Sequence, residues 1–275
     1  MIPKIAFSYW EGDEFTYLHS LTIKTFAFYN PEFKIIIYTP TINSSHRISW
    51  NSGEHENIIK KTSELSELSK INNVSIIKID IENDLKLADQ LTPVHRSDYV
   101  RVKKLYEHGG FWIDFDIFFI KSIQDTWLHS DKLNIIKYNI HENLPIGFIW
   151  APPGNNIVLT ILNNIETILR TNSTLNEYQF IGASLWTKML NLHNNYDTYN
   201  ETIIYPYLPH NLIHLFYRNC NAIKDDTIGI HWYNGDKCTR LFLSDINNNK
   251  INSTINKLIN KFLLLETNKI RPMNI

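Results

Sequence analysis

Two carboxylates separated by one residue stand inside an aromatic, apolar stretch of the chain. Asp114 and Asp116 lie in the run FWIDFDIFFI, residues 111–120, whose aromatic and β-branched side chains predict a buried strand. Side chains two apart on a strand point the same way, so both carboxylates are expected to face one spot. Two such charges raise each other's pKa, and burial adds a desolvation cost. A cation such as Mn²⁺ or Mg²⁺ resolves the conflict, because it prefers oxygen ligands and leaves positions open for phosphate oxygens. The alternative is that the strand ends here and both carboxylates face water.

A helix is predicted immediately before this strand. The Thr-Pro pair at residues 92–93 supplies an N-cap and a proline at the first helical position, and the Gly-Gly pair at 109–110 suits a helix end. Asp98 and Arg101 are three residues apart and therefore share one helix face. An exposed pair of this spacing contributes only about 0.3–0.5 kcal/mol, so Asp98→Ala is expected to cost activity much more than stability.

The segment SD-x-x-R followed by LYEHGGFWIDFD resembles the signature of glycosyltransferases with a DXD sugar-binding region, a group that includes capsular-polysaccharide, α-mannosyl and α-galactosyl transferases. The close similarity covers residues 94–123. It implies a GT-A fold, a nucleotide-sugar donor and Mn²⁺ or Mg²⁺ as cofactor. By this resemblance Asp116, the second acid of the motif, is the more direct metal ligand, and Asp114 is shared between the metal and the ribose. Asp98 is expected to reach a sugar hydroxyl, with Arg101 beside it on the donor side.

The resemblance extends to both ends of the chain. It implies that aromatic side chains at the tip of the opening strand, Tyr9 and Trp10, stack on the nucleotide base, although core packing explains them equally well. It also implies that His231, in TIGIHWYNGDK, joins the two acids at the metal, which favours Mn²⁺. A packed, hydrogen-bonded histidine is the alternative. The remaining expected donor contacts are Phe115, Gly182, Trp232 and Lys237.

The reacting centre is expected at residues 176–184, where polar groups open a predicted helix beside small residues. By resemblance the reaction retains the anomeric configuration. Retention requires an enzyme nucleophile below the sugar, or a same-face displacement in which the leaving phosphate takes the acceptor proton. Glu177 could trap a glycosyl intermediate, whereas Gln179 would stabilise developing positive charge through its carbonyl dipole. The alternative for each is a helix cap.

The elements before residue 123 alternate between strand and helix, which predicts an α/β fold with a Rossmann-like, nucleotide-binding half. A mixed sheet and an acceptor-side helical and irregular half are expected to complete a single GT-A domain over residues 1–275, divided at 123/124. Ligands bind such sheets beyond the carboxyl ends of the strands. The predicted strands are 2–10, 34–38, 74–81, 111–120, 133–138, 146–151 and a short one at 227–231. The predicted helices are 18–28, 56–70, 93–108, 158–169, 176–192 and 251–263, and residues 203–216 are expected to be irregular.

Composition excludes several classes of function. The 275 residues carry a formal net charge of −1, so nothing favours binding to nucleic acid. Two cysteines form neither a disulfide framework nor a thiolate metal site. No apolar run reaches the ~20 residues of a membrane span, and the opening residues lack the apolar core of a signal peptide, so a cytoplasmic protein is expected. The amphipathic stretch 251–263 is expected to pack on its own domain, with peripheral membrane contact as the alternative.

The sequence therefore predicts a metal-dependent, retaining hexosyl or N-acetylhexosaminyl transferase. Its donor is expected to be a UDP-sugar in preference to a GDP-sugar, and its acceptor a glycan or another hydroxyl compound. A phosphatase of the haloacid-dehalogenase type also places D-x-D after an apolar strand, with Asp225 and Asp226 as its later acidic pair. Against it, Phe118 stands where that class has Thr or Val, and the motif lies far from the N-terminus. A non-catalytic carbohydrate-binding protein is the third hypothesis.

Overall fold

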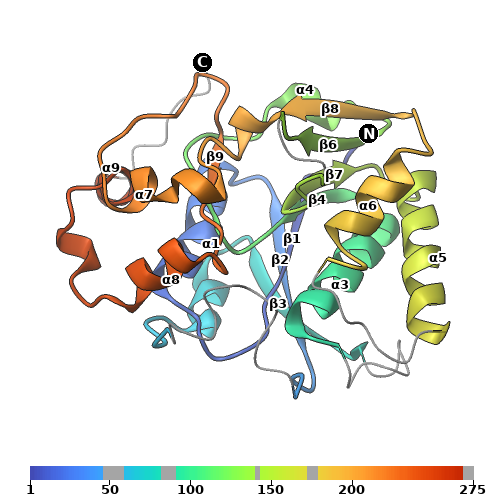
Figure 1. Cartoon of the computed structure of the whole chain (residues 1–275), viewed down its shortest axis with the longest axis horizontal. Coiled ribbons are helices and arrows are strands. Elements are labelled where there is room, and N and C mark those ends of the chain that lie inside the picture. Colours follow the sequence, from blue (N-terminus) through green and yellow to red (C-terminus); the bar gives the residue numbers. More distant parts are fainter. Residues whose placement is uncertain (46–58, 82–90, 140–142, 172–178, 269–275) are drawn as a thin grey trace.

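The computed structural model describes residues 1–45, 59–81, 91–139, 143–171 and 179–268, and its centre is a seven-stranded sheet of order β3-β2-β1-β4-β7-β6-β8 (Figure 1). The strands are β1 (Ile5–Tyr9), β2 (Lys34–Pro40), β3 (Val74–Ile79), β4 (Gly110–Ile113), β6 (Leu133–Lys137), β7 (Phe148–Ala151) and β8 (Tyr196–Asn200). All run in one direction except β7, which is antiparallel to both β4 and β6. The predicted mixed α/β sheet is confirmed, and it draws strands from both sides of residue 123.

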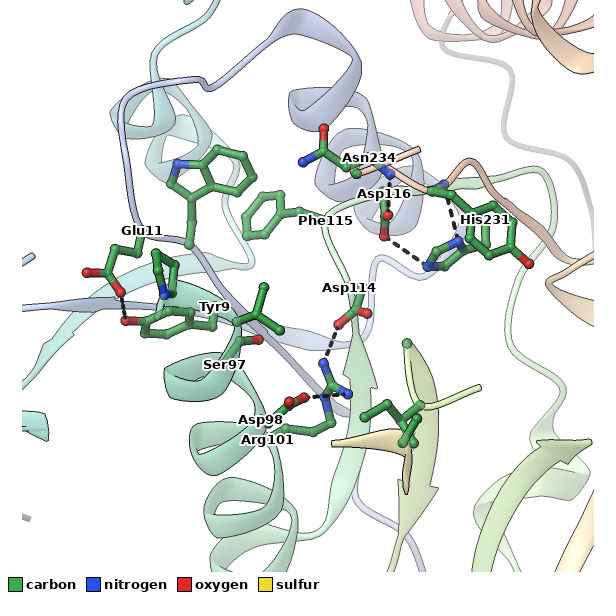
Figure 2. A pocket seen from close by; sticks show the side chains of 18 of the residues that line it. Tyr9, Glu11, Ser97, Asp98, Arg101, Asp114, Phe115, Asp116, His231 and Asn234 are labelled. Carbon is green, nitrogen blue, oxygen red and sulfur yellow. Dashed lines mark hydrogen bonds and ion pairs between the residues drawn. The ribbon is translucent and has the colours of Figure 1, made fainter. Parts of the chain in front are cut away.

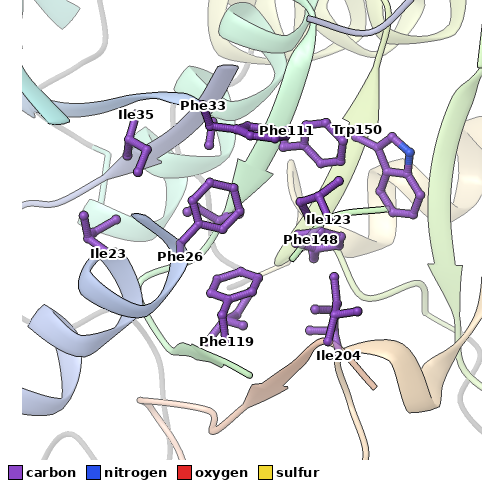
Figure 3. Packing of buried hydrophobic residues seen from close by; sticks show 14 of the residues in the cluster. Ile23, Phe26, Phe33, Ile35, Phe111, Phe119, Ile123, Phe148, Trp150 and Ile204 are labelled. Atoms are coloured by element: carbon purple, nitrogen blue, oxygen red, sulfur yellow. The ribbon is translucent and has the colours of Figure 1, made fainter. Parts of the chain in front are cut away.

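Side chains alternate across this sheet and feed two cores. On one face Phe7, Ile36 and Trp112 pack with helices α3 (Pro93–His108), α5 (Asn156–Thr171) and α6 (Ala183–Leu190). On the other face, residues one position away along the same strands pack with α1 (Tyr17–Tyr29) in an aromatic cluster that Figure 3 shows around Phe26, Phe111 and Phe148. Burial of both faces explains why the central strands β4 (GFWI) and β7 (FIWA) are apolar throughout.

A second sheet has two antiparallel strands, β5 (Ile117–Phe119) and β9 (Gly229–His231), which pair with Ile117 opposite His231. Three helices of the C-terminal part, α7 (Leu212–Phe216), α8 (Lys237–Ser244) and α9 (Thr254–Thr267), surround a third core that includes Phe118 and Trp232. In α9, Ile255 and Phe262 are buried in this core, so the predicted packing of the C-terminal helix on its own domain is confirmed.

Some predicted elements are wrong in extent. Of the helix expected over 56–70, only the 3₁₀ turn η1 (Leu65–Lys70) forms in the described part, because the polar residues before it offer no apolar face to bury. The helix expected over 176–192 begins only at Ala183, and residues 179–182 form a turn. The stretch 203–216, expected to be irregular, contains η4 (Pro209–Asn211) and α7.

Several short elements complete the chain and were not predicted. They are α4 (Asp125–Leu128), η3 (Glu201–Ile203), η5 (Asn248–Lys250), β8 and α8. Strand β8 reads YDTYN and is largely polar, because it lies at the sheet edge beside β6. Cys220 is exposed and Cys238 half-buried, and both are free thiols. Among the described residues, no helix combines the length and apolar character needed to cross a bilayer.

Candidate active site

A cavity of about 1120 Å³ opens beyond the carboxyl ends of β1, β2 and β4, where ligands bind in open α/β sheets. Its wall contains the segment after β1, the first turns of α3, the Asp114–Asp116 turn and the chain after β9 (Figure 2). Gln179 and Tyr205, which lie between the Asp114–Asp116 turn and β9 in the sequence, also line the wall. The predicted location of the site is therefore occupied by a large cavity, and nearly all its polar groups come from loops and helix ends.

Asp114 and Asp116 converge through a turn, not along one strand. The strand predicted over 111–120 is interrupted: β4 ends at Ile113, β5 begins at Ile117, and the two belong to different sheets. The Asp114 N–H donates to the Gly147 carbonyl at 2.8 Å, whereas the Asp116 carbonyl accepts from the Trp232 N–H at 2.8 Å. The argument from strand alternation was thus wrong, because the chain leaves the first sheet between the two acids. The convergence itself is present, since one ligand atom from each of Asp114, Asp116 and His231 lies within 4.8 Å of the others.

Asp114 is held from one side. The Arg101 guanidinium contacts its Oδ1 at 3.0 Å and the Trp112 indole N–H donates to the same oxygen at 2.6 Å. Burial raises the pKa of Asp114, Arg101 opposes that rise, and the neighbouring Asp116 adds to it. The other oxygen, Oδ2, lies against Gly147 on the side of His231. The Asp114 oxygen that faces Asp116 and His231 is therefore Oδ2, whereas Arg101 and Trp112 hold Oδ1.

Asp116 is held by the chain around β9. His231 Nε2 lies 3.0 Å from Oδ1, and the Asn234 N–H donates to Oδ2 at 2.8 Å. Burial opposes ionisation of this carboxyl, but His231 and the Asn234 amide together hold its pKa below the ordinary value. The Tyr233 N–H approaches His231 Nδ1 at 3.3 Å, which places the imidazole proton on Nε2, facing Asp116. Coordination of a cation through Nε2 would require the tautomer with its proton on Nδ1. That tautomer would lose the 3.3 Å hydrogen bond from the Tyr233 N–H.

The space between these three side chains fits a divalent cation. Two carboxylates and one imidazole are a donor set that Mn²⁺ accepts. Gly147 borders the same space, and a Cβ at this position would lie 2.8 Å from Asp114 Oδ2 and 3.0 Å from His231 Nε2. A residue without a side chain thus leaves room where the three ligand atoms meet.

Asp98 and Arg101 form the ion pair that the helical spacing predicts, with Arg101 Nη1 3.2 Å from Asp98 Oδ1 (Figure 2). Unlike the exposed pair assumed from sequence, both side chains are almost fully buried, at 3% and 5% exposure. Burial raises the pKa of Asp98 to about 7, Arg101 opposes this, and Asp114 adds to it. Arg101 consequently joins Asp98 and Asp114. The premise of an exposed Asp98–Arg101 pair is wrong, so Asp98→Ala is now expected to cost stability as well as activity.

We expect Asp98→Ala to lower the free energy of unfolding by about 3 kcal/mol, because it leaves the Arg101 guanidinium buried with one fewer partner. Asp98→Asn should cost only about 1 kcal/mol, since its amide oxygen would still lie beside the Arg101 guanidinium. Urea unfolding measures both. The matched control is Asp197→Ala, which breaks the Lys132–Asp197 pair, where both side chains are about 40% exposed, and should cost at most about 1 kcal/mol. Equal losses for Asp98→Ala and Asp197→Ala would contradict the prediction.

The same variants carry a pH signature. Because the pKa of Asp98 is higher in the folded protein, about 7, than its ordinary value of 3.8, the folded state binds more protons than the unfolded state between these values. This residue therefore makes stability fall as the pH rises from about 4 to about 7. The slope should be shallower in Asp98→Asn than in the wild type when both are unfolded in chelator.

Tyr9 and Trp10 both line the cavity, as the stacking prediction requires. Tyr9 is 7% exposed, and its hydroxyl donates at 2.6 Å to Glu11, which also pairs with Arg96 at 3.3 Å. Trp10 is half-buried and meets Phe15 and Phe115 edge-on, with ring centroids 5.0 and 5.3 Å away. The Tyr9 ring is fixed in the wall by a buried acid and base.

The other predicted site residues are distributed unevenly. Phe115 and Gln179 line the cavity, and Gln179 Oε1 accepts from the Asn143 amide at 3.0 Å. Gly182 is buried beneath the wall, where a Cβ would lie 2.5 Å from Asp98 Oδ2. Trp232 is fully buried in the third core and Lys237 is exposed, and neither lines the cavity. Glu177 lies outside the described residues.

Sequence reasoning missed several residues of the wall. Glu11, Tyr138, Tyr205, Tyr233 and Asn234 all line the cavity. For three of them the sequence offered one signal, which was proximity along the chain: Tyr233 and Asn234 closely follow His231, and Glu11 closely follows Tyr9. Nothing in the sequence singles out Tyr138 or Tyr205, because an aromatic residue in an apolar stretch is usually core.

Residues 17–134 match the family described as "Glycosyltransferase sugar-binding region containing DXD motif". Among solved structures, the PaToxG glycosyltransferase is 17% identical and covers 70% of this chain and 69% of its own, with a TM-score of 0.50. The galactosyltransferase LgtC, solved with donor and acceptor sugar analogues, is 10% identical and covers 83% and 86%, with a TM-score of 0.47. The glycosyltransferase GlyE of Streptococcus pneumoniae TIGR4 is 12% identical and covers 96% and 64%, with a TM-score of 0.49. No curated protein matches the sequence significantly.

Residues 17–134 are therefore similar to the sugar-binding region of glycosyltransferases that carry a DXD motif, and the likeness to the PaToxG structure shows that the chain has the same mixed α/β fold, GT-A. The motif is Asp114-Phe115-Asp116, which lies within the matched segment and at the floor of the cavity.

Proposed function

We propose that this protein is a metal-dependent, retaining glycosyltransferase that transfers a hexose or N-acetylhexosamine from a UDP-sugar to a hydroxyl of a glycan or another acceptor. One observation carries the proposal: Asp114, Asp116 and His231 offer ligand atoms within 4.8 Å of one another in the wall of a cavity of about 1120 Å³. Buried acids in such a group are stable as anions only when positive charge is brought to them. A divalent cation held by these residues would satisfy that requirement and would account for the DXD motif.

Asp114, Asp116 and His231 would hold the cation, with Mn²⁺ preferred because an imidazole takes part. A bound cation of this kind supplies a Lewis acid that neutralises the leaving diphosphate. Arg101 favours the ionised form of Asp114, by opposing the rise in its pKa, and fixes the carboxylate through Nη2 at 3.0 Å. His231 and the Asn234 N–H do the same for Asp116. Preorganised charges of this kind need little rearrangement during the reaction.

The donor would lie with its base toward the β1 end of the cavity, beside Tyr9 and Trp10, and its sugar toward Asp98. Asp98 reaches this region from α3, where Ser97 and Arg101 also line the wall. On the opposite side Gln179 faces the cavity and is held by Asn143. Its carbonyl dipole is our candidate for stabilising positive charge at the anomeric carbon. With an amide in that position, we favour same-face displacement over a covalent intermediate.

The phosphatase hypothesis loses its second acidic pair. Asp225 and Asp226 do not line the cavity, and the Asp226 carboxylate accepts from the Thr202 hydroxyl at 2.7 Å. A pair of acids at the motif alone does not provide the later acidic site that this class uses.

The proposal is tested by incubating the protein with a panel of nucleotide sugars and Mn²⁺ and measuring release of nucleoside diphosphate. UDP-hexoses and UDP-N-acetylhexosamines are expected to give the fastest release, with or without a sugar acceptor, and the product anomer reports retention. Release of inorganic phosphate from phosphate esters in place of nucleoside diphosphate would favour the phosphatase hypothesis.

Metal removal gives a separate prediction. With excess chelator, UDP binding measured by calorimetry should weaken at least about 10-fold, because the diphosphate would then face the two carboxylates with no cation to offset the repulsion. Added Mn²⁺ should restore it. The control is uridine, which carries no diphosphate and should bind equally with and without metal. If UDP bound equally well in excess chelator, the assignment of Asp114 and Asp116 to a metal would fail.

A further inference from the structure

Tyr205 carries a buried hydroxyl that has no hydrogen-bond partner among the described residues. The side chain is 2% exposed, yet it lines the cavity. A phenylalanine would fill the same space without an unpaired polar atom, and buried hydroxyls are nearly always hydrogen-bonded. An orphaned hydroxyl in the wall of a binding cavity therefore points to a partner that arrives with the ligand.

The Tyr205 hydroxyl faces the space where the carboxylates of Asp114 and Asp116 meet the imidazole of His231. A Cβ built on Gly147 would lie 3.1 Å from Tyr205 Oη, 2.8 Å from Asp114 Oδ2 and 3.0 Å from His231 Nε2. These three polar atoms come from distant parts of the chain and surround a residue that has no side chain. Tyr205 thus belongs to the immediate surroundings of the DXD site, although it lies 89 positions beyond Asp116 in the sequence.

The ring is fixed before any ligand binds. The Tyr205 N–H donates to the Glu201 carbonyl at 2.7 Å, and the adjacent Ile204 carbonyl accepts from the His231 N–H at 2.7 Å. The ring lies 5.0 Å from His231 and 5.3 Å from Tyr138, centroid to centroid. The backbone bond between residues 204 and 231 ties the hydroxyl to the same strand that positions His231.

The chemistry of the hydroxyl decides what it can bind. The Tyr205 side chain is a phenol, whose ordinary pKa of about 10 keeps it protonated at neutral pH, so it has a proton to donate. A cation would prefer the two carboxylates beside the hydroxyl, whereas the hydroxyl itself suits an anionic oxygen of a bound ligand.

We infer that the Tyr205 hydroxyl donates a hydrogen bond to an oxygen of the diphosphate in the bound nucleotide. This inference rests on the proposed function. It makes Tyr205 a contact of the leaving group: the hydrogen bond strengthens as negative charge develops on the departing diphosphate, so it favours both binding and departure. The hydrogen bond that we infer joins Tyr205 to the diphosphate and not to the base, the ribose or the cation.

The test is Tyr205→Phe, which removes one oxygen atom and retains the ring. With Mn²⁺ present, calorimetry should show UDP binding about 10-fold more weakly to the variant, as expected for loss of a hydrogen bond to a charged group. Affinity for Mn²⁺ alone, followed by electron paramagnetic resonance, should be unchanged, and so should affinity for uridine. The melting temperature of the ligand-free variant should be equal or higher, because an unpaired buried hydroxyl has been removed.

Tyr207→Phe is the matched control. Tyr207 is 1% exposed, lies two residues away and does not line the cavity, and its hydroxyl donates to the Cys220 carbonyl. Removing this satisfied hydroxyl should lower the melting temperature and leave UDP affinity unchanged. Tyr205→Phe should therefore lower UDP affinity without lowering stability, whereas Tyr207→Phe should lower stability without lowering UDP affinity. A purely structural role for Tyr205 would not produce this difference.

Equal UDP affinity in the wild type and Tyr205→Phe would overturn the inference and leave the proposed function standing. A loss of affinity for Mn²⁺ alone would also overturn it, since the hydroxyl would then belong to the cation site. Should the wild type bind neither UDP nor any other nucleoside diphosphate with Mn²⁺, the proposed function itself fails and the inference with it.

Discussion

Asp116→Asn should reduce transfer by a factor on the order of 100 to 1,000, since a bound cation supplies several kcal/mol of transition-state stabilisation. The substitution retains the shape of the side chain and removes its charge. The amide oxygen of the new side chain would still accept from the Asn234 N–H, which in the wild type donates to Asp116 Oδ2 at 2.8 Å. The chain around β9 should therefore remain in place, and the loss should appear in the rate and in Mn²⁺ affinity.

Three measurements separate this effect from unfolding: release of nucleoside diphosphate, Mn²⁺ affinity, and the melting temperature in chelator. We expect the first two to fall and the third to stay close to that of the wild type. Asp125→Asn is the control, because this acid is 76% exposed and only approaches Lys4 at 3.6 Å. Turnover close to normal in Asp116→Asn would remove the DXD acids from the mechanism.

Gly110→Ala should have the largest effect on folding, with a loss of at least about 3 kcal/mol in the free energy of unfolding. Gly110 opens β4 with φ of +99°, and an added Cβ would lie 2.4 Å from the Ile5 carbonyl oxygen. That oxygen belongs to the backbone of β1, so the contact is relieved only by moving β1 away from β4. These two strands end at Tyr9 and before Asp114, so the displacement would also distort the cavity.

Gly154→Ala separates the steric contribution from the backbone contribution. Gly154 also has positive φ, +69°, but no heavy atom lies within 4 Å of a Cβ built there. Its substitution should cost only about 1 kcal/mol, the backbone cost alone. Urea unfolding of both variants gives the difference. Similar losses at the two glycines would show that β1 and β4 can move apart freely.

The sequence by itself determined the parts of this protein that depend on local chemistry. The Thr-Pro start and Gly-Gly end of α3 follow from backbone preferences, and Thr92 caps the helix as predicted, by accepting from the His95 N–H at 3.3 Å. The predicted strands β1, β2 and β3 are confirmed. In β1 and β2 nearly every residue is buried, which requires apolar side chains on both faces, whereas the edge strand β3 is partly exposed. The spacing of Asp98 and Arg101 placed acid and base on one face, and the D-x-D triplet in its aromatic setting pointed to the similarity with DXD glycosyltransferases that residues 17–134 show.

The surroundings of the triplet were decided by the tertiary structure. The aromatic and β-branched residues on both sides of Asp114 and Asp116 favour extended backbone equally, so local propensity cannot show that the chain changes sheets between them. That change depends on β5 pairing with β9, and the register of Ile117 with His231 is a contact between residues more than a hundred positions apart. Burial of the Asp98–Arg101 pair depends likewise on α6, which carries the segment of Gly182 against Asp98. Tyr205 joins the site only because its backbone neighbour, Ile204, bonds to His231, and such long-range pairings are fixed by the complementarity of whole elements, which no local pattern encodes.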